Sequence, residues 1–168
     1  WQCQLDQMSV DRRVIAWDCP GYGGSDDHSL SSPSPADYAD ALAELLKGIG
    51  VDEPIDLIGH SMGAFIGLEA AATLGDRIAS LVVMGLGAAM PVHPALQTAA
   101  DDDDPLAADL MAGWMHGPDQ KFGTNPTPGM SMTGTSRAVI ETSPDGVLAG
   151  DLALCGAYDG AVDAGAAI

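Results

Sequence analysis

The sequence predicts an α/β fold built on a mostly parallel sheet with helices on both faces. Three apolar runs of strand length, at 13–17, 54–58 and 79–84, alternate with helix-length segments at 35–49 and 64–74. Parallel strands need crossover helices between them, and strands buried on both faces have continuous apolar runs. The order strand, helix, strand, helix, strand meets both requirements.

The N-terminal segment predicts one helix, one strand and one loop. Residues 1–9 carry apolar side chains at helical spacing, which predicts a short amphipathic helix. The apolar run 13–17 predicts the first strand. Residues 18–26 are dense in Gly, Pro, Ser and Asp, so we expect a loop after that strand.

The first long helix has a clear start and one apolar face. Ser34 is a good N-cap, with Pro35 at the first helical position and Asp37 placed to complete a capping box. Gly48 and Gly50 mark the end of the helix. The residues that share its apolar face are Tyr38, Leu42, Leu45, Leu46 and Ile49.

The second strand runs directly into a serine motif. Residues 54–58 lead into Gly59–Gly63, which fits the pattern Gly-x-Ser-x-Gly. The largely apolar segment 64–74 then predicts a helix that Gly75 can cap. This context suits a nucleophilic serine, because the turn lifts the hydroxyl above the sheet and the helix N-terminus stabilises developing negative charge.

The 168 residues are long enough for one domain with a buried core, and we expect three parts within it. The core occupies residues 1–87. Residues 88–146, rich in Gly, Pro, Met and Asp, predict a lid-like insertion, with a helix near Leu106–Trp114. An apolar helix at Val147–Tyr158 then returns towards the core within residues 147–168.

The charge balance restricts the partners of the chain. There are 24 acidic and 6 basic residues, a net charge of −18. Such a surface is a poor match for nucleic acid or anionic membranes, and no apolar run reaches the roughly 20 residues of a membrane span. We therefore expect no nucleic-acid or membrane partner, and the sequence carries no signal for an oligomeric state. Asp101–Asp104 lacks the alternating spacing of a calcium loop and predicts a solvated surface run.

The three cysteines, Cys3, Cys19 and Cys155, predict neither a disulfide framework nor a zinc site, because they are odd in number and scattered. Cys19 has no histidine placed to activate it as a nucleophile, which favours a small buried apolar side chain. Reduced thiols predict a cytoplasmic protein, whose natural N-terminus we expect to precede Trp1.

Three stretches of the chain together resemble the α/β-hydrolase superfamily, in particular its single-domain esterases, haloperoxidases and C–C hydrolases. They are residues 13–26, 55–63 and 77–83, which occur in the family order with the family gaps. The resemblance covers residues 1–87 well and the rest of the chain more loosely. It is specific for the fold and weak for the substrate.

The resemblance implies the roles of the serine motif. Ser61 would be the catalytic nucleophile between the elbow glycines Gly59 and Gly63, and the backbone N–H of Met62 would be one oxyanion-hole donor. The implied activity is hydrolysis of a carboxylic ester or a related acyl or C–C bond in a small-molecule substrate, without metal or organic cofactor. Alternatives are a cofactor-free perhydrolase or lyase that uses the same serine, and a non-catalytic ligand-binding protein on the same fold.

The resemblance also predicts that this chain is a fragment. In the family the acid and then the histidine follow the serine, after later strands. The chain ends at residues 164–168, about where the acid-bearing strand would begin, and the loop with the second oxyanion donor would lie before Trp1. We therefore expect triad acid and base to lie outside these residues, and the fragment alone to be inactive.

Other catalytic candidates inside the chain are weaker. A triad of Ser61, one of Asp101–Asp109, and His116 would keep the family order but would need an acid at the end of a strand. We expect all histidines to be loop, surface or packing residues: His28, His60, His93 and His116. Three aromatic residues could line a pocket, although core packing is favoured for them: Trp17, Tyr22 and Trp114.

Overall fold

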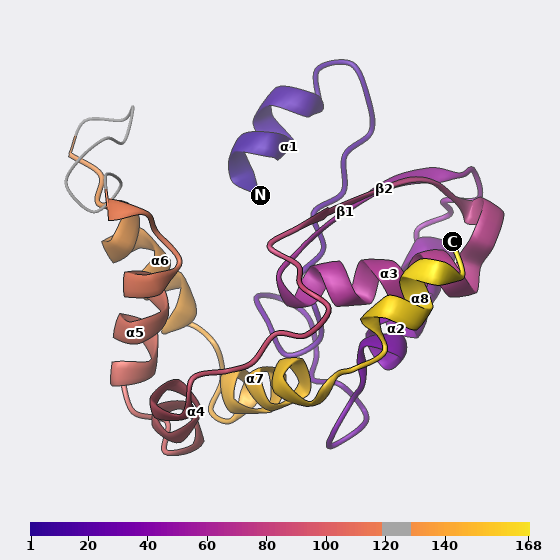
Figure 1. The fold of residues 1–168 in the computed structure, drawn as a ribbon. Helices are drawn as coiled ribbons and strands as arrows, with labels where there is room; N and C mark the ends of the chain where they lie inside the picture. The colour runs from indigo at the N-terminus through magenta and orange to yellow at the C-terminus, as the bar shows by residue number, and fades with distance from the viewer. Residues whose placement is uncertain (119–128) are drawn as a thin grey trace.

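The computed structural model describes residues 1–118 and 129–168 and has two parallel strands among its helices (Figure 1). The strands are β1 (Ile55–His60) and β2 (Ile78–Met84). The helices are α1 (Gln2–Met8), α2 (Pro35–Gly48), α3 (Met62–Leu74), the short 3₁₀ helix η1 (Gly75–Arg77), α4 (Pro94–Asp101), α5 (Leu106–Trp114), α6 (Met132–Ile140), α7 (Val147–Ala157) and α8 (Ala161–Ala166). The α/β class is confirmed.

The sheet pairs β1 with β2 in parallel, and α3 is the crossover between them (Figure 1). Helix α3 packs on both strands, and α2 and α8 pack on α3. The opposite face is open, because Ile58 (37%), Val82 (48%) and Met84 (40%) keep much of their surface exposed. The prediction that helices cover both faces is therefore wrong for this part of the chain. Side chains alternate between the two faces along β1, and Asp56 lies on the same exposed face as Ile58.

The expected strand at 13–17 is also wrong, because this segment has no regular secondary structure. Within the described residues, no backbone hydrogen bond joins it to β1 or β2. A strand exists only where a neighbouring strand accepts and donates its backbone hydrogen bonds. The burial expected of such a strand is also limited: Trp17 packs against the core, but Ile15 is 43% exposed.

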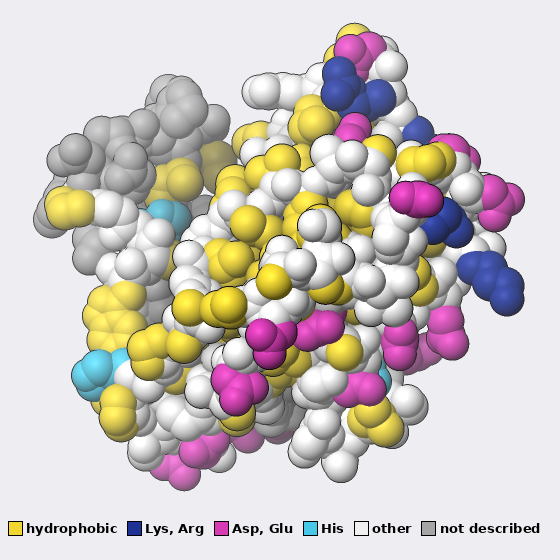
Figure 2. Space-filling view, turned by 45° about the vertical axis from the view of Figure 1, so that its right-hand side comes forward, with side chains coloured by type: hydrophobic (Ala, Val, Ile, Leu, Met, Phe, Trp, Pro, Cys, Tyr) yellow, Lys and Arg dark blue, Asp and Glu magenta, His cyan; other side chains and the backbone are white. Residues whose placement is uncertain are grey.

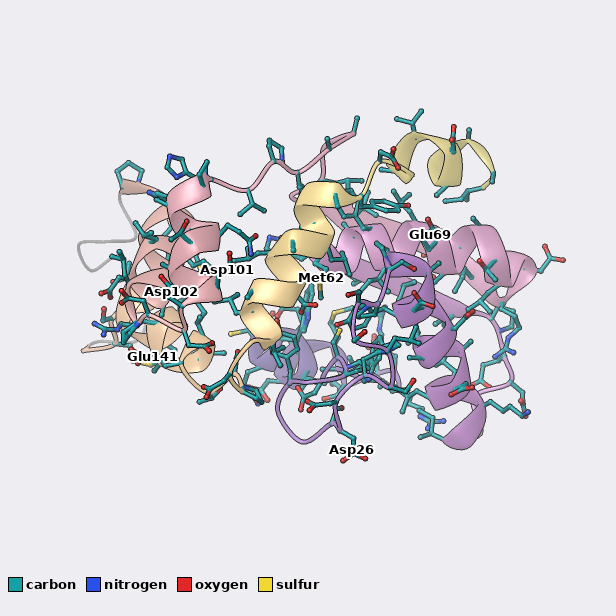
Figure 3. The ribbon with its side chains drawn as sticks, turned by 90° about the horizontal axis from the view of Figure 1, so that it is seen from below. Asp26, Met62, Glu69, Asp101, Asp102 and Glu141 are labelled. Carbon is teal, nitrogen blue, oxygen red and sulfur yellow. The ribbon has the colours of Figure 1, made fainter. Side chains whose placement is uncertain are left out.

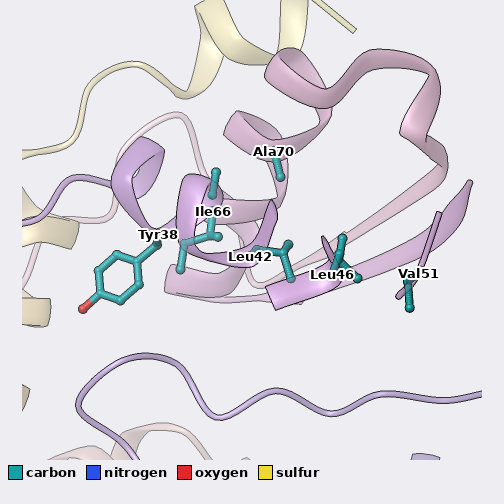
Figure 4. Close-up of a cluster of buried hydrophobic side chains, with 7 residues drawn as sticks. Tyr38, Leu42, Leu46, Val51, Ile66 and Ala70 are labelled. Atoms are coloured by element: carbon teal, nitrogen blue, oxygen red, sulfur yellow. The ribbon is translucent and has the colours of Figure 1, made fainter. Parts of the chain in front are cut away.

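Helix α2 begins as its sequence predicts. Ser34 Oγ accepts the N–H of Asp37 at 3.3 Å, and the Asp37 carboxylate accepts the N–H of Ser34 at 2.7 Å, which completes the capping box. The buried face of α2 then packs against α3 (Figure 4). This core cluster consists of Tyr38, Ala39, Leu42, Leu46, Val51, Ile66 and Ala70.

A buried carboxylate joins three distant parts of the chain. Asp151 on α7 is 7% exposed and accepts hydrogen bonds from the hydroxyls of Tyr22 at 2.6 Å and Tyr38 at 2.9 Å. Burial raises the pKa of the Asp151 carboxyl above its ordinary value, while the two tyrosine hydrogen bonds act in the opposite direction. The loop at residue 22, α2 and α7 are thereby held together.

The lid-like segment, residues 88–146, contains α4, α5 and α6, which group at one side of Figure 1. The helix predicted at Leu106–Trp114 is confirmed as α5. A cluster formed by Leu96, Ala99, Ala100 and Ala107 contacts Leu148 and Leu152 of α7. Residues 119–128 of the predicted segment lie outside the described residues. The division into core, lid-like segment and returning helix stays a prediction.

A second connection fixes the C-terminal helices on α3. The hydroxyl of Tyr158 donates to the carboxylate of Glu69, and the ring of Tyr158 lies 4.6 Å from that of Phe65, measured between centroids. Phe65 is fully buried and shares a cluster with Ala161 and Ala164 of α8. The helix predicted at Val147–Tyr158 is thus confirmed as α7 (Val147–Ala157), and Tyr158 at its end is anchored to the helix that follows β1.

The surface carries scattered charge. Figure 2 shows carboxylates spread over one face between apolar side chains, with few Lys and Arg residues near its edge. Among residues 1–118 and 129–168, no helix combines the length and apolar character needed to cross a bilayer.

Asp151 generates a pH-dependent prediction. Because its folded-state pKa lies above the unfolded value of about 3.9, its contribution to stability is complete below that value and is lost as pH rises through the folded pKa. We expect Asp151→Asn to flatten the fall in the free energy of unfolding that sets in above about pH 4, because an amide has no proton to lose there. Urea unfolding at a series of pH values measures this.

The matched control is Asp40→Asn on the exposed side of α2, which makes the same change in net charge. If Asp151→Asn and Asp40→Asn alter the pH dependence equally, burial of Asp151 is not its cause.

Candidate active site

Ser61 lies at the turn between β1, which ends at His60, and α3, which begins at Met62. The predicted order of strand, turn and helix is therefore confirmed. Ser61 has φ 54° and ψ −125°, a conformation that L-residues rarely adopt. Such a backbone costs about 1–3 kcal/mol and persists only where the surroundings hold it in place.

Two backbone hydrogen bonds hold this turn. The N–H of Ser61 donates to the carbonyl of Met84 at 2.9 Å, and the N–H of Ala64 donates to the carbonyl of Ser61 at 2.8 Å. The first bond continues the parallel pairing of β1 and β2, in which His60 lies opposite Met84. The second begins the first turn of α3. The strained residue is thus held between the sheet and the helix.

The two elbow glycines are not equivalent. A Cβ on Gly59 would collide with the backbone carbonyl of Gly63, so only glycine fits at this position. A Cβ on Gly63 would meet nothing within 4 Å outside its own helix. The sequence predicted small residues on both sides of Ser61, and the structure requires one at Gly59.

The N-terminus of α3 can bind an anion formed beside Ser61. Met62 is the first residue of the helix, so its N–H has no acceptor within the helix. The helix dipole adds partial positive charge at this end. The side chain of Met62 packs against the core cluster of α2 and α3, which fixes the backbone that carries this N–H.

Three of the four histidines have hydrogen-bond partners away from Ser61. Nδ1 of His28 accepts the N–H of Leu30, Nδ1 of His93 accepts the N–H of Ala95, and Nε2 of His116 lies 2.8 Å from Ser136 Oγ. His60 is exposed beside the elbow. Within the described residues, no hydrogen bond joins a histidine or a carboxylate to Ser61 Oγ. A base for the serine is therefore not assembled in this part of the chain.

The acidic candidates do not complete a triad either. Asp109 forms an ion pair with Arg137 at 3.0 Å, and Asp103 accepts the N–H of Gly146 at 2.9 Å. In Figure 3, Asp101 and Asp102 come from the lid-like segment, whereas Met62 and Glu69 lie on α3. Within the described residues, no group of three or more His, Cys, Asp or Glu side chains could hold a metal ion.

Cys19 is unsuited to nucleophilic chemistry. Burial, together with the negative charges of Asp151 and Asp18, raises the pKa of the Cys19 thiol to about 11. The thiolate is the reactive form, so it is scarce near neutral pH. The described cysteines are free: Cys3, Cys19 and Cys155.

The aromatic residues have separate environments. Trp17 is partly buried against the core, as expected, and Tyr22 binds Asp151. Trp114 is 54% exposed, with its ring 5.3 Å from that of His93, so the expectation of a core position is wrong for it. Trp114 is the last residue of α5, and no pattern in the neighbouring sequence indicates that its side chain is exposed.

A cavity of about 670 Å³ lies between the loop near residue 28, α2 and α7. Its lining includes Asp27, His28, Tyr38, Asp151 and Tyr158, and does not include Ser61. Sequence analysis missed Asp151, the buried carboxylate of this wall, because no local motif marks an aspartate in an apolar helix.

A strand that ends in a strained serine and continues into a helix is the arrangement of α/β hydrolases. The family model described as alpha/beta hydrolase fold matches residues 1–128. The chain therefore belongs to the α/β-hydrolase family.

Individual relatives are similar over the same region. The chain is 37% identical over 84 residues to 2-hydroxy-6-oxononadienedioate/2-hydroxy-6-oxononatrienedioate hydrolase 1 of Dechloromonas aromatica, covering 50% of this chain and 29% of that protein. It is 37% identical over 90 residues to homoserine O-succinyltransferase of Xanthomonas campestris, covering 54% of this chain and 22% of the relative.

Solved structures support the fold. A thermophilic esterase from Thermogutta terrifontis superposes with a TM-score of 0.71 at 23% identity, over 95% of this chain and 60% of the esterase chain. The matched region amounts to 29–31% of the length of three curated hydrolase relatives.

The different surroundings of Gly59 and Gly63 predict different effects of the same substitution on stability. We expect Gly59→Ala to lower the free energy of unfolding by more than about 3 kcal/mol, because its Cβ collides with backbone that cannot move independently. We expect Gly63→Ala to change it by no more than about 1 kcal/mol, because alanine favours helix and meets open space. Urea unfolding of both variants measures the difference. Equal losses would contradict the asymmetry of the turn.

Proposed function

We propose that Ser61 is the nucleophile of a serine hydrolase that acts on a carboxylic ester or a related acyl or C–C bond. The observation that carries the proposal is the strained backbone of Ser61, with φ 54°, at the junction of β1 and α3. Strain of this kind concentrates at functional sites, where the surrounding structure maintains it. The hydrolase relatives support the same chemistry.

The proposed mechanism begins with attack of Ser61 Oγ on the carbonyl carbon of the substrate. The hydroxyl proton passes to a general base as the new C–O bond forms. The negative charge that develops on the carbonyl oxygen is stabilised by the N–H of Met62 at the N-terminus of α3. Collapse expels the leaving group, and water then releases the acyl group. This chemistry requires neither metal nor organic cofactor.

We propose that the triad acid, the base and the second oxyanion donor come from residues of a longer protein outside this chain. Support comes from the hydrogen-bond partners of His28, His93 and His116, which lie away from Ser61 Oγ, and from the greater length of the relatives. The substrate would be a small molecule and the complete enzyme cytoplasmic.

A second candidate is acyl transfer to an alcohol instead of water. The similarity to homoserine O-succinyltransferase favours it. The first half of the reaction would be the same, with Ser61 carrying the acyl group. The acceptor in the second half distinguishes the two candidates.

The proposal predicts covalent labelling of Ser61 in the complete protein. A fluorophosphonate probe should modify Ser61 and leave Ser61→Ala unmodified, because the probe reacts with activated serines. Peptide mapping by mass spectrometry identifies the site. A folded complete protein that remains unlabelled would overturn the nucleophile assignment.

We also expect the isolated 168-residue chain to show negligible esterase activity, since loss of the general base alone costs about 10⁶-fold in kcat. Hydrolysis of p-nitrophenyl acetate measures this. Turnover that disappears in Ser61→Ala would show that acid and base lie within the chain.

A different experiment, addition of an alcohol acceptor to the complete enzyme, distinguishes hydrolysis from acyl transfer.

A further inference from the structure

A glycine that directly follows β2 lies beside the elbow. Gly85 follows Met84, whose carbonyl accepts the N–H of Ser61. It has φ +63°, so it shares the left-handed region with Ser61. Each of the two strands is thus followed by a residue with positive φ, and the hydrogen bond from Ser61 to Met84 joins the strands at this point.

The space above Gly85 is occupied by the side chain that precedes Ser61. A Cβ on Gly85 would lie 3.2 Å from Nε2 and 3.3 Å from Cδ2 of His60, and 3.8 Å from the backbone nitrogen of Ser61. The first two distances are shorter than ordinary van der Waals contact, so His60 would have to move. The atoms that would move belong to the imidazole of His60, which is exposed, and a shift of a few tenths of an ångström would relieve the crowding.

We propose that Gly85 is a positioning residue for the Ser61 nucleophile. Its missing side chain lets the His60 imidazole lie over the end of β2, and this contact keeps the Met84 carbonyl within reach of the Ser61 N–H. The inference rests on the proposed role of Ser61 and extends the machinery of the elbow to β2, beyond the Gly-x-Ser-x-Gly motif itself.

Positioning matters here because Ser61 must present two groups at once. The backbone of Ser61 sets the direction of its Cα–Cβ bond, from which Oγ must reach the carbonyl carbon, while the neighbouring Met62 N–H must point at the carbonyl oxygen. Displacements of less than about 1 Å in such a constellation are enough to reduce catalysis. A shift at the Met84 hydrogen bond would rotate both groups together.

The first test measures the hydrogen bond directly, without catalysis. In Gly85→Ala we expect amide exchange in a peptide spanning residues 59–64 to become about tenfold faster, because the bond from Ser61 to Met84 opens more readily. The matched control is Gly50→Ala, which has a similar φ of +67° but open space around the added Cβ. Hydrogen exchange with mass spectrometry on the 168-residue chain provides the readout.

A second variant keeps the proposal testable if Gly85→Ala fails to fold. His60→Ala removes the imidazole and leaves the backbone of Gly85 unchanged, so it should also speed exchange in residues 59–64. Unchanged exchange in His60→Ala, or equal acceleration in Gly50→Ala and Gly85→Ala, would overturn the proposal.

The third test concerns reactivity in the complete protein. Gly85→Ala should lower the maximal rate of fluorophosphonate labelling about tenfold or more, with little change in the concentration giving half that rate. The double variant His60→Ala/Gly85→Ala should lose less than the two single losses combined, because the imidazole that Cβ crowds is gone. Additive losses, or a wild-type rate in Gly85→Ala, would overturn the positioning role.

The two readouts separate the possible failures. If the wild-type complete protein is not labelled, the proposed function fails, and the exchange experiment still decides whether Gly85 holds the backbone of Ser61. If labelling occurs and the variants leave exchange unchanged, the positioning role fails and the nucleophile assignment stands.

Discussion

The parallel pairing of β1 with β2 is the constraint on which the rest of the structure depends. Parallel neighbours need a crossover, and α3 provides it within the residues between the two strands. The chain must therefore reverse direction between His60 and Met62. That reversal places Ser61 in a strained conformation, and the hydrogen bond to Met84 that maintains the strain belongs to the same strand pair. The conformation of Ser61 at the candidate site therefore depends on the pairing of β1 with β2.

Local signals in the sequence predicted the features that depend on neighbouring residues. The capping box of Ser34 and Asp37 and the extent of α5 are set by residues a few positions apart, and both appear as expected. The serine motif likewise predicted its own strand, turn and helix. The strand expected at residues 13–17 is not formed, because a strand also needs a neighbouring strand to pair with, and that strand can be distant in sequence.

The site shows the same division between local and distant information. Ser61 and Gly59 were predictable, because the turn that needs them is contained in five residues. The importance of Gly85 was not, since it depends on the register that brings the end of β2 beside His60. Asp151 was missed for a similar reason, as its tyrosine partners are 129 and 113 residues away in sequence. No local pattern marks contacts of that range.

The connection from Tyr22 and Tyr38 to Asp151 also has a consequence for how the chain folds. Closing loops of 113 and 129 residues has an entropic cost that short-range contacts avoid, so α2, β1, α3 and β2 can assemble before α7 joins them. The same docking step removes a carboxylate from water. Folding would therefore bury the Asp151 carboxylate late, and the docked position of α7 would depend on pH through that carboxylate.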